Sequence, residues 1–524
     1  MSLYPPRDIH STKMLILVFF ISCFLQLTSS SPIPTSLNIN GLHRPIDLIQ
    51  SPFDIAKPII LSWSNTNNHP TTASLFSNNT YLLHINNLST PITIHNNSTF
   101  YQFKLQDLQP LTSYKIQLHH INHVNNRSTI SFETAPSNFS SAQWIGGGSE
   151  VQTTWNIHLT NKVTITKVRA YASGLGAFEL QCSGNKMGTS YMDPGQSVYD
   201  QKVLYVGFDL TACLATNSTA VISAKIGNGK WGYLDIYTNR TLVNDQSGDS
   251  TRSFILYAFA ELSNGTRTEL VTNANEWSYR HGPIVYDHMW HGEIYDARQE
   301  TALWISPAIQ MNPKIGILVP QNMPPIRITK TYSPVSIRTD SDGSKVYDIG
   351  TNAAGFVTLE LIETNECIHG KTFKVTMEHS EIESTNGVPF NNYYPGMEFN
   401  HSKTCSMKDW YAREWYECAN QTDAFIFTTS ATTSTHTYQP TFTYHGFRYV
   451  RVVVTELSDG DEESLPLVSY PFNISLLGHR VHSNLKTRAT IDLSQPKNAG
   501  YTAIATSTLF ENIFNATLQS HGGF

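Results

Sequence analysis

Residues 162–182 read Lys-Val-Thr-Ile-Thr-Lys-Val-Arg-Ala-Tyr-Ala-Ser-Gly-Leu-Gly-Ala-Phe-Glu-Leu-Gln-Cys, two stretches of strand composition separated by a glycine-containing turn. β-Branched and aromatic residues favour strands, and glycine favours turns. The same composition, bounded by turn residues, recurs at residues 203–210, 219–226 and 253–262. These segments predict an all-β domain over residues 138–311.

Two further β-rich regions flank this domain. Residues 32–137 alternate apolar and polar side chains in short runs, which predicts an antiparallel β-sandwich. Within it, Leu108-Gln-Pro-Leu-Thr-Ser-Tyr114 resembles the tyrosine corner of fibronectin type III domains, and Trp63 is a candidate core residue. On the other side, the Pro- and Asn-containing residues 311–325 precede a third β-rich unit, residues 320–480. We therefore expect a mainly β chain of tandem sandwiches, of jelly-roll or fibronectin type III-like form.

Length and composition agree with several folded domains. The 524 residues allow about three to five domains. Charged residues make up 15% of the chain and hydrophobic residues 40%, which argues against disorder and against a coiled coil. The formal net charge is −6, so no basic surface is expected to attract nucleic acid.

The N-terminus indicates export. Arg7 and Lys13 precede the uncharged run 14–27 (MLILVFFISCFLQL), and small residues follow it before Pro32. This order is typical of a signal peptide, here residues 1–31. The run of about 14 residues is shorter than the roughly 20 that span a bilayer, so a signal peptide is favoured over a membrane anchor. We expect a secreted, extracellular protein with no membrane span after cleavage.

Export would permit glycosylation and disulfide formation. The candidate glycosylation sites are Asn78, Asn87, Asn126, Asn217, Asn239, Asn264, Asn400, Asn420 and Asn473. Proximity in the sequence suggests the disulfides Cys182–Cys213 and Cys405–Cys418, although sequence cannot fix the connectivity. One further cysteine is either buried or paired with a partner elsewhere. No CxxC or Cys/His spacing indicates a structural zinc.

Only the last residues change from strand to helix periodicity. Apolar side chains between Thr502 and Gln519 recur mostly three to five residues apart, which predicts one amphipathic helix. A single helix has no helical partner in this chain to cover its apolar stripe. We expect residues 484–524 to be the start of a helical domain whose remainder is absent from the chain.

The densest group of functional side chains lies in residues 277–298. Three interpretations remain open for it. His288 and His291 could bind a metal together with Asp287 or Glu293. Alternatively, paired Asp and Arg side chains hold a turn within aromatic packing, which is the favoured interpretation. In the third, Trp290 offers a face to a sugar ring and carboxylates accept hydrogen bonds from its hydroxyl groups.

Acidic residues elsewhere give only a weak signal for catalysis. Glu378, Glu381 and Glu383 could be a general acid/base pair, but a glycosidase needs carboxyl groups that face each other across a substrate, roughly 5 to 9 Å apart. Charged strand ends are the favoured interpretation. No nucleophile-elbow, zinc-protease or phosphate-loop motif is present.

Three ordered motifs resemble a known family. Residues 285–298 (VYDHMWHGEIYDAR), 347–356 (YDIGTNAAGF) and 442–450 (FTYHGFRYV) are similar to successive signatures of the α-L-rhamnosidases of glycoside hydrolase family 78. The similarity extends over roughly residues 142–524, and the fibronectin-like unit before it resembles an accessory module of such enzymes.

The resemblance implies a plan for the chain. It consists of an N-terminal carbohydrate-binding-like sandwich (138–311), a concanavalin-like sandwich (320–480) and an (α/α)6 barrel, entered at residues 484–524, that hydrolyses terminal α-L-rhamnosides with inversion. The family's acidic motif, of the type Asp-Cys-Pro-x-Arg-Glu, would follow Phe524 and is absent. No catalytic residue is therefore assigned to this chain, which we expect to be inactive alone.

The resemblance also bears on binding residues. Some relatives hold calcium with an Asp-Asn pair, but the comparable loop here, Gly188-Thr-Ser-Tyr191, lacks that pair, so we expect neither calcium nor another cofactor. Residues 228–233 (NGKWGY) resemble a family loop that ends in aromatic residues, although Trp231 is favoured as a core or rim residue. The candidate sugar contacts are Trp231, Tyr233, Asp287, Trp290 and Glu293.

Two hypotheses for the whole chain follow. The favoured one is the accessory part of a secreted α-L-rhamnosidase that acts on rhamnose-containing glycans or glycosides. The alternative is a secreted β-sandwich protein that binds glycans or cell surfaces without catalysis.

Overall fold

The computed structural model divides into two compact units, Met1–Leu48 with Ile55–Ala135, and Ile49–Asp54 with Pro136–Phe524. The division after Ala135 lies beside the boundary expected at residue 137. The structure describes residues 34–39, 59–65, 79–86, 91–96, 101–105, 108–122, 124–139, 141–160, 162–231, 252–289, 291–321, 323, 325–364, 369–382, 421–430, 435–458 and 460–482. Of residues 34–39, 59–65 and 101–105 it describes the backbone alone.

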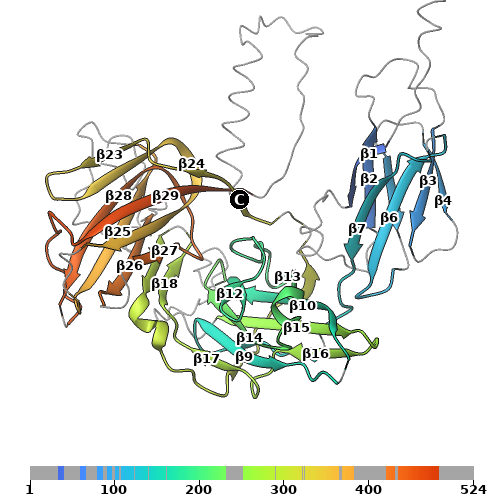
Figure 1. Cartoon of the computed structure of the whole chain (residues 1–524), viewed down its shortest axis with the longest axis horizontal. Coiled ribbons are helices and arrows are strands. Elements are labelled where there is room, and N and C mark those ends of the chain that lie inside the picture. Colours follow the sequence, from blue (N-terminus) through green and yellow to red (C-terminus); the bar gives the residue numbers. More distant parts are fainter. Residues whose placement is uncertain are drawn as a thin grey trace, which may run out of the picture. The chain divides into compact units, whose positions relative to one another are not determined.

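The described residues of the first unit form seven strands in two antiparallel sheets (Figure 1). One sheet has the order β1 (Pro34–Ile39), β2 (Ile59–Asn65), β5 (Tyr101–Leu105), and the other the order β4 (Ile92–Asn96), β3 (Asn79–Ile85), β6 (Ser113–His120), β7 (Ser128–Glu133). In β6, Tyr114, Ile116 and Leu118 alternate with more exposed residues and are buried. The Tyr114 hydroxyl accepts a hydrogen bond from the Gln109 backbone N–H at 2.8 Å, which is the contact expected of a tyrosine corner.

The second unit begins with a sandwich of a seven-stranded and a five-stranded sheet. The larger sheet has the order β20 (Ile309–Gln310), β8 (Ile145–Gly146), β15 (Ser253–Leu262), β10 (Ile165–Leu175), β13 (Lys202–Asp209), β21 (Ile317–Pro320), and β16 (Arg267–Val271) also pairs with β15. The smaller sheet has the order β12 (Asn185–Lys186), β11 (Ala177–Cys182), β14 (Thr219–Gly227), β9 (Glu150–Asn156), β17 (Ser278–Arg280).

The stretch 162–182 crosses between these two sheets. It forms β10 and β11, which belong to different sheets, and Gly176 joins them at φ +102°. A Cβ atom at Gly176 would lie 2.1 Å from the Asn228 carbonyl oxygen, so only glycine fits the turn. The core between the sheets includes the fully buried Trp277 and Phe254. The predicted disulfide Cys182–Cys213 is formed and joins β11 to the short helix α3 (Thr211–Leu214).

The rest of the second unit is built on a ten-stranded sheet (Figure 1). Its order is β18 (Ile284–His288), β19 (Gly292–Asp296), β26 (Thr422–Thr428), β25 (Thr372–Ser380), β28 (His445–Leu457), β24 (Lys345–Glu363), β29 (Phe472–His482), β22 (Arg327–Tyr332), while β23 (Ser336–Thr339) and β27 (Thr435–Tyr438) also pair with β24. The register of β24 shifts between Asp348 and Ala353. Buried apolar residues from several strands of this sheet, including Val357 of β24 and Phe447 of β28, form a second core.

The strand pairing links the two regions of the second unit. The β18–β19 hairpin was expected in the domain of residues 138–311, but β19 pairs in parallel with β26 of the ten-stranded sheet. β21, which lies in the expected linker and reaches only to Pro320, pairs in parallel with β13 of the first sandwich. The ten-stranded sheet thus contains a piece of chain from the region expected to form the first sandwich. Such parallel, long-range pairs leave no local signal in the sequence.

The mainly β prediction is confirmed by these sheets. The predicted signal peptide, the helix at residues 502–519 and the Cys405–Cys418 pair lie outside the described residues. In the part that is described, no helix is both long and apolar enough to cross a membrane.

Four of the predicted glycosylation sites can be located. Asn126, Asn217, Asn264 and Asn473 are exposed, as a glycan would require, and glycosylation itself stays a prediction. The other five candidates lie outside the described residues, at Asn78, Asn87, Asn239, Asn400 and Asn420.

Candidate functional site

Two of the predicted sugar contacts, Asp287 and Glu293, lie opposite each other on the β18–β19 hairpin. Their side chains are not accessible, because Asp287 is 1% and Glu293 0% exposed. The structure therefore corrects the expectation that these carboxylates contact a sugar. Each instead binds groups of the protein.

Asp287 ties the hairpin to the first sandwich. Its Oδ1 atom lies 2.8 Å from Arg252 Nη2, and its Oδ2 atom accepts a hydrogen bond of 2.7 Å from the Asn228 backbone N–H. Both side chains of the ion pair are almost fully buried. Burial raises the pKa of Asp287, while Arg252 and the Asn228 N–H oppose the rise. The favoured interpretation of the sequence, an Asp–Arg pair within residues 277–298, fits Asp296 and Arg298, whose Oδ2 and Nη2 atoms lie 2.7 Å apart, whereas the Arg252 partner of Asp287 lies outside that segment.

Glu293 ties the same hairpin to a loop of the ten-stranded sheet. Its carboxylate accepts hydrogen bonds from the backbone N–H groups of Thr441 (3.0 Å) and Phe442 (2.9 Å), and the Tyr438 hydroxyl lies 3.3 Å away. Burial raises the pKa of Glu293 to about 8, against the opposing effect of the two N–H donors. Phe442 in turn packs with Ala177 and Ile284 in a small apolar cluster.

The remaining candidate sugar contacts are aromatic. Trp231 is half-buried, and its ring lies 5.3 Å from that of Tyr199 at an interplanar angle of 76°. This edge-on packing fits the rim or core position favoured by the sequence, and a sugar contact by Trp231 stays a prediction. Tyr233 and Trp290 lie outside the described residues.

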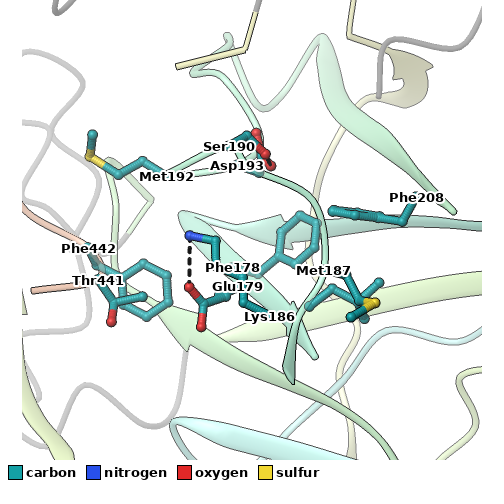
Figure 2. Close-up of a pocket in the computed structure, with 11 residues that line it drawn as sticks. Phe178, Glu179, Lys186, Met187, Ser190, Met192, Asp193, Phe208, Thr441 and Phe442 are labelled. Carbon is teal, nitrogen blue, oxygen red and sulfur yellow. Dashed lines mark hydrogen bonds and ion pairs between the residues drawn. The ribbon is translucent and has the colours of Figure 1, made fainter. Parts of the chain in front are cut away.

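A small cavity is lined by residues of the first sandwich together with Thr441 and Phe442 (Figure 2). Its volume is about 10 Å³, the room that one water molecule needs and far less than a monosaccharide occupies. Figure 2 shows the Lys186 ammonium above the Glu179 carboxylate, 3.0 Å apart, with Asp193 and Ser190 on the opposite side and Phe442 at one end. The cavity is therefore a polar packing defect and not a sugar pocket.

The carboxyl groups around this cavity differ in their electrostatics. Asp193 is buried and accepts a hydrogen bond from the Ser190 hydroxyl, and burial raises its pKa to about 6. For Glu179, burial acts in the same direction, but Lys186 and Lys225 outweigh it and lower the pKa. The loop Gly188–Tyr191, considered above for calcium, supplies no carboxylate of its own.

The metal site considered in the sequence is not assembled around His288 and His291. Their ring centroids are 4.0 Å apart, and burial lowers the pKa of both. The carboxylates of Asp287 and Glu293 bind the protein groups described above. The structure therefore does not offer them as metal ligands together with the two imidazole rings.

A different set of potential metal ligands is assembled from three other strands. His379, Asp423 and His445 come from β25, β26 and β28, and their ligand atoms all lie within 4.8 Å of one another. All three side chains are buried. Sequence reasoning missed this group, because its members are far apart in the chain; the only local signal was the presence of His445 in one of the three family-like motifs.

The acidic residues considered for catalysis serve other contacts. Glu378 forms an ion pair with Arg451 at 2.8 Å, and Glu381 accepts a hydrogen bond from the Asn352 amide at 3.0 Å. Glu383 lies outside the described residues. The favoured interpretation, charged groups at strand ends, therefore describes Glu378 and Glu381.

Family comparisons agree with this architecture. Residues 163–330 match the family model of the α-L-rhamnosidase N-terminal domain, and residues 338–465 match that of the bacterial α-L-rhamnosidase concanavalin-like domain. An α-L-rhamnosidase of Formosa agariphila is 27% identical over 314 residues, which cover 56% of this chain and 29% of that protein. An α-L-rhamnosidase of Streptomyces avermitilis is 26% identical over 298 residues, which cover 55% of this chain and 25% of that protein. The aligned region thus spans less than a third of either relative.

Solved structures show the same fold. The α-L-rhamnosidase from Dictyoglumus thermophilum superposes with a TM-score of 0.64 at 22% identity, over 86% of this chain and 49% of that one. The enzyme from Aspergillus terreus gives a TM-score of 0.62 at 18% identity, also over 86% of this chain and 49% of that one.

Proposed function

The chain belongs to the α-L-rhamnosidases of glycoside hydrolase family 78, and we propose that it is the accessory part of a secreted enzyme that removes terminal α-L-rhamnose from glycosides. The observation that carries the proposal is the match of both sandwiches, in order, to the two rhamnosidase domain models.

In this proposal the double sandwich is a rigid platform and does not hydrolyse the substrate. Two carboxyl groups that act on a glycoside must be accessible from a common cleft. Asp287 and Glu293, the acidic residues of the most characteristic motif, are instead buried and bonded to protein groups. We therefore assign hydrolysis to residues outside the two sandwiches.

The proposed hydrolytic activity is tested on the longest protein expressed from the gene that encodes this chain. Incubation with an aryl α-L-rhamnoside should release L-rhamnose, and NMR should detect the β-anomer first, since inversion at an α-linked carbon gives the β-product. Release of the α-anomer first would overturn the inverting mechanism, and failure to cleave any α-L-rhamnoside would overturn the proposed activity.

A further inference from the structure

Three buried polar side chains meet on adjacent strands of the ten-stranded sheet, away from the cavity described above. In the order β26, β25, β28, these strands supply Asp423, His379 and His445. His379 and Asp423 are 0% exposed and His445 is 1% exposed. The two imidazole rings stack with centroids 4.2 Å apart, and His445 Nε2 lies 3.1 Å from Asp423 Oδ1.

The hydrogen bonding of this cluster is incomplete. His379 Nδ1 lies 3.1 Å from the Gln421 carbonyl oxygen, so the ring proton belongs on Nδ1 and Nε2 carries a lone pair. His379 Nε2 and Asp423 Oδ2 are 3.9 Å apart, and neither atom has a hydrogen-bond partner. Two acceptors thus face each other in a buried space. Buried polar atoms without partners are uncommon in native proteins, and an ion or a water molecule usually satisfies them.

The charges point to an ion and not to water. A buried carboxylate is normally paired with a cation. Within the described part of the chain, the ion-pair contacts of Asp423 are to the two histidines, with no Lys or Arg among them. A cation between His379 Nε2 and Asp423 Oδ2 would satisfy both orphaned atoms and neutralise the carboxylate.

We propose that His379, Asp423 and His445 bind a divalent transition-metal ion of the zinc class. Tetrahedral zinc with bonds of about 2.0–2.1 Å places its ligand atoms about 3.3 Å apart. The separation of 3.1 Å between His445 Nε2 and Asp423 Oδ1 is close to one edge of that tetrahedron, and the ion would replace the hydrogen bond that these atoms share. His379 Nε2 lies 3.9 Å from the other carboxylate oxygen, Asp423 Oδ2, so the carboxylate would turn or bind through both of its oxygens. Two imidazoles favour zinc over calcium, which prefers oxygen ligands.

The surroundings fit a structural metal. The hydrogen bond from His379 Nδ1 to the Gln421 carbonyl fixes the tautomer and orients the ring, as the outer contacts of zinc-binding histidines do. Asp423 Oδ1 accepts a hydrogen bond of 2.9 Å from the Glu293 backbone N–H. The ion would therefore join three strands and brace the β18–β19 hairpin through Asp423. It takes no part in the hydrolysis proposed above.

Metal content of the full chain tests the proposal. The protein is refolded or expressed with zinc, dialysed against metal-free buffer and analysed by mass spectrometry, and we expect about one zinc per chain. Cobalt loading should give the intense visible absorption of four-coordinate Co²⁺. A chain that is folded by circular dichroism and holds neither zinc nor cobalt overturns the proposal, and this result requires no variant.

Two variants and a matched control locate the site. Asp423→Asn and His379→Gln should each lose most of the bound metal and the cobalt absorption. His479→Gln is the control, because His479 is another buried histidine of the same sheet whose ring nitrogens lie near the Thr331 and Thr358 hydroxyls. It should keep about one zinc per chain. Equal metal loss in all three variants, or full retention in both site variants, contradicts the assignment.

Discussion

Asp287 and Glu293 are direct cross-strand partners on the β18–β19 hairpin, yet their carboxylates bind different sandwiches. Asp287 pairs with Arg252 and the Asn228 N–H, and Glu293 accepts the N–H groups of Thr441 and Phe442. The hairpin therefore clamps the two sandwiches together with buried charge. This relationship gives both carboxylates of the motif a structural role that needs no contact with a sugar.

Removal of the Asp287 charge should destabilise the clamp. Asp287→Asn removes a buried carboxylate that pairs with the Arg252 guanidinium at 2.8 Å, and breaking such a buried pair costs about 3–5 kcal/mol. The measurement is the free energy of unfolding in urea. Glu456→Gln is the control, because the Lys371–Glu456 pair is largely solvated and should contribute less than about 1 kcal/mol. Equal effects of the two substitutions would contradict the clamp.

Close packing at the same junction predicts a steric effect. A Cβ atom at Gly227 would lie 2.4 Å from Phe442 Cγ, so Gly227→Ala forces the Phe442 ring out of place. We expect a loss of about 1–3 kcal/mol in the free energy of unfolding. Gly460→Ala is the control, because a Cβ atom there meets nothing within 4 Å. A neutral Gly227→Ala variant would show that the two regions do not pack as described.

The buried Asp193 should make stability fall with rising pH. Its pKa rises from 3.8 in the unfolded chain to about 6 in the fold, so the folded state binds more protons between these values. The stabilisation is complete below pH 3.8 and lost as the pH rises through about 6, a change of up to about 3 kcal/mol. Urea unfolding at several pH values should show a steeper fall in stability between about pH 4 and 6 in the wild type than in Asp193→Asn, where the raised pKa of Glu293 still contributes a slope.

Glu179, across the same cavity, should have the opposite effect. Although burial opposes it, Lys186 and Lys225 hold the pKa of Glu179 below its usual value. Its contribution is therefore present above the unfolded pKa and is lost as the pH falls through the folded one. Glu179→Gln should therefore lose less stability than the wild type as the pH falls through the pKa of Glu179. If Asp193→Asn and Glu179→Gln change the pH profile in the same direction, the electrostatic description of the cavity is wrong.

The disulfide should increase the free energy of unfolding, because it reduces the conformational entropy of the unfolded chain. Cys182 and Cys213 are separated by 31 residues, and closing a loop of that length stabilises a fold by about 3–4 kcal/mol in the chain-entropy model. The double variant Cys182→Ala with Cys213→Ala should lose this amount in urea unfolding under oxidising conditions. Under reducing conditions the wild type and the variant should become similar, and a persistent difference would point to packing instead of the crosslink.

Local pattern predicted the strands and the tandem sandwich plan, because alternation and composition are local properties. The stretch 162–182 forms two strands, and Tyr114 makes its corner contact. The pattern could not place the β18–β19 hairpin, because its parallel pairing with β26 depends on residues far along the chain. The burial of this hairpin's carboxylates is set by tertiary packing. The local sequence therefore could not exclude them as sugar contacts.

The candidate metal ligands illustrate the same limit. His379, Asp423 and His445 have no diagnostic spacing, and only the order of strands β26, β25 and β28 brings them together. The sequence directed attention to His288 and His291, which are close in the chain but lack convergent free carboxylates. Family resemblance, in contrast, was readable from three short motifs, because their order along the chain is itself specific.

We propose that the two sandwiches support hydrolysis and do not perform it. The most direct measurement is the release of chromophore from an aryl α-L-rhamnoside by the purified, folded chain, compared with a buffer blank and with an active α-L-rhamnosidase. We predict a rate equal to the blank. A rate above the blank that co-purifies with the chain and falls in the Glu293→Gln variant would contradict the claim, because it would place catalysis within the clamp.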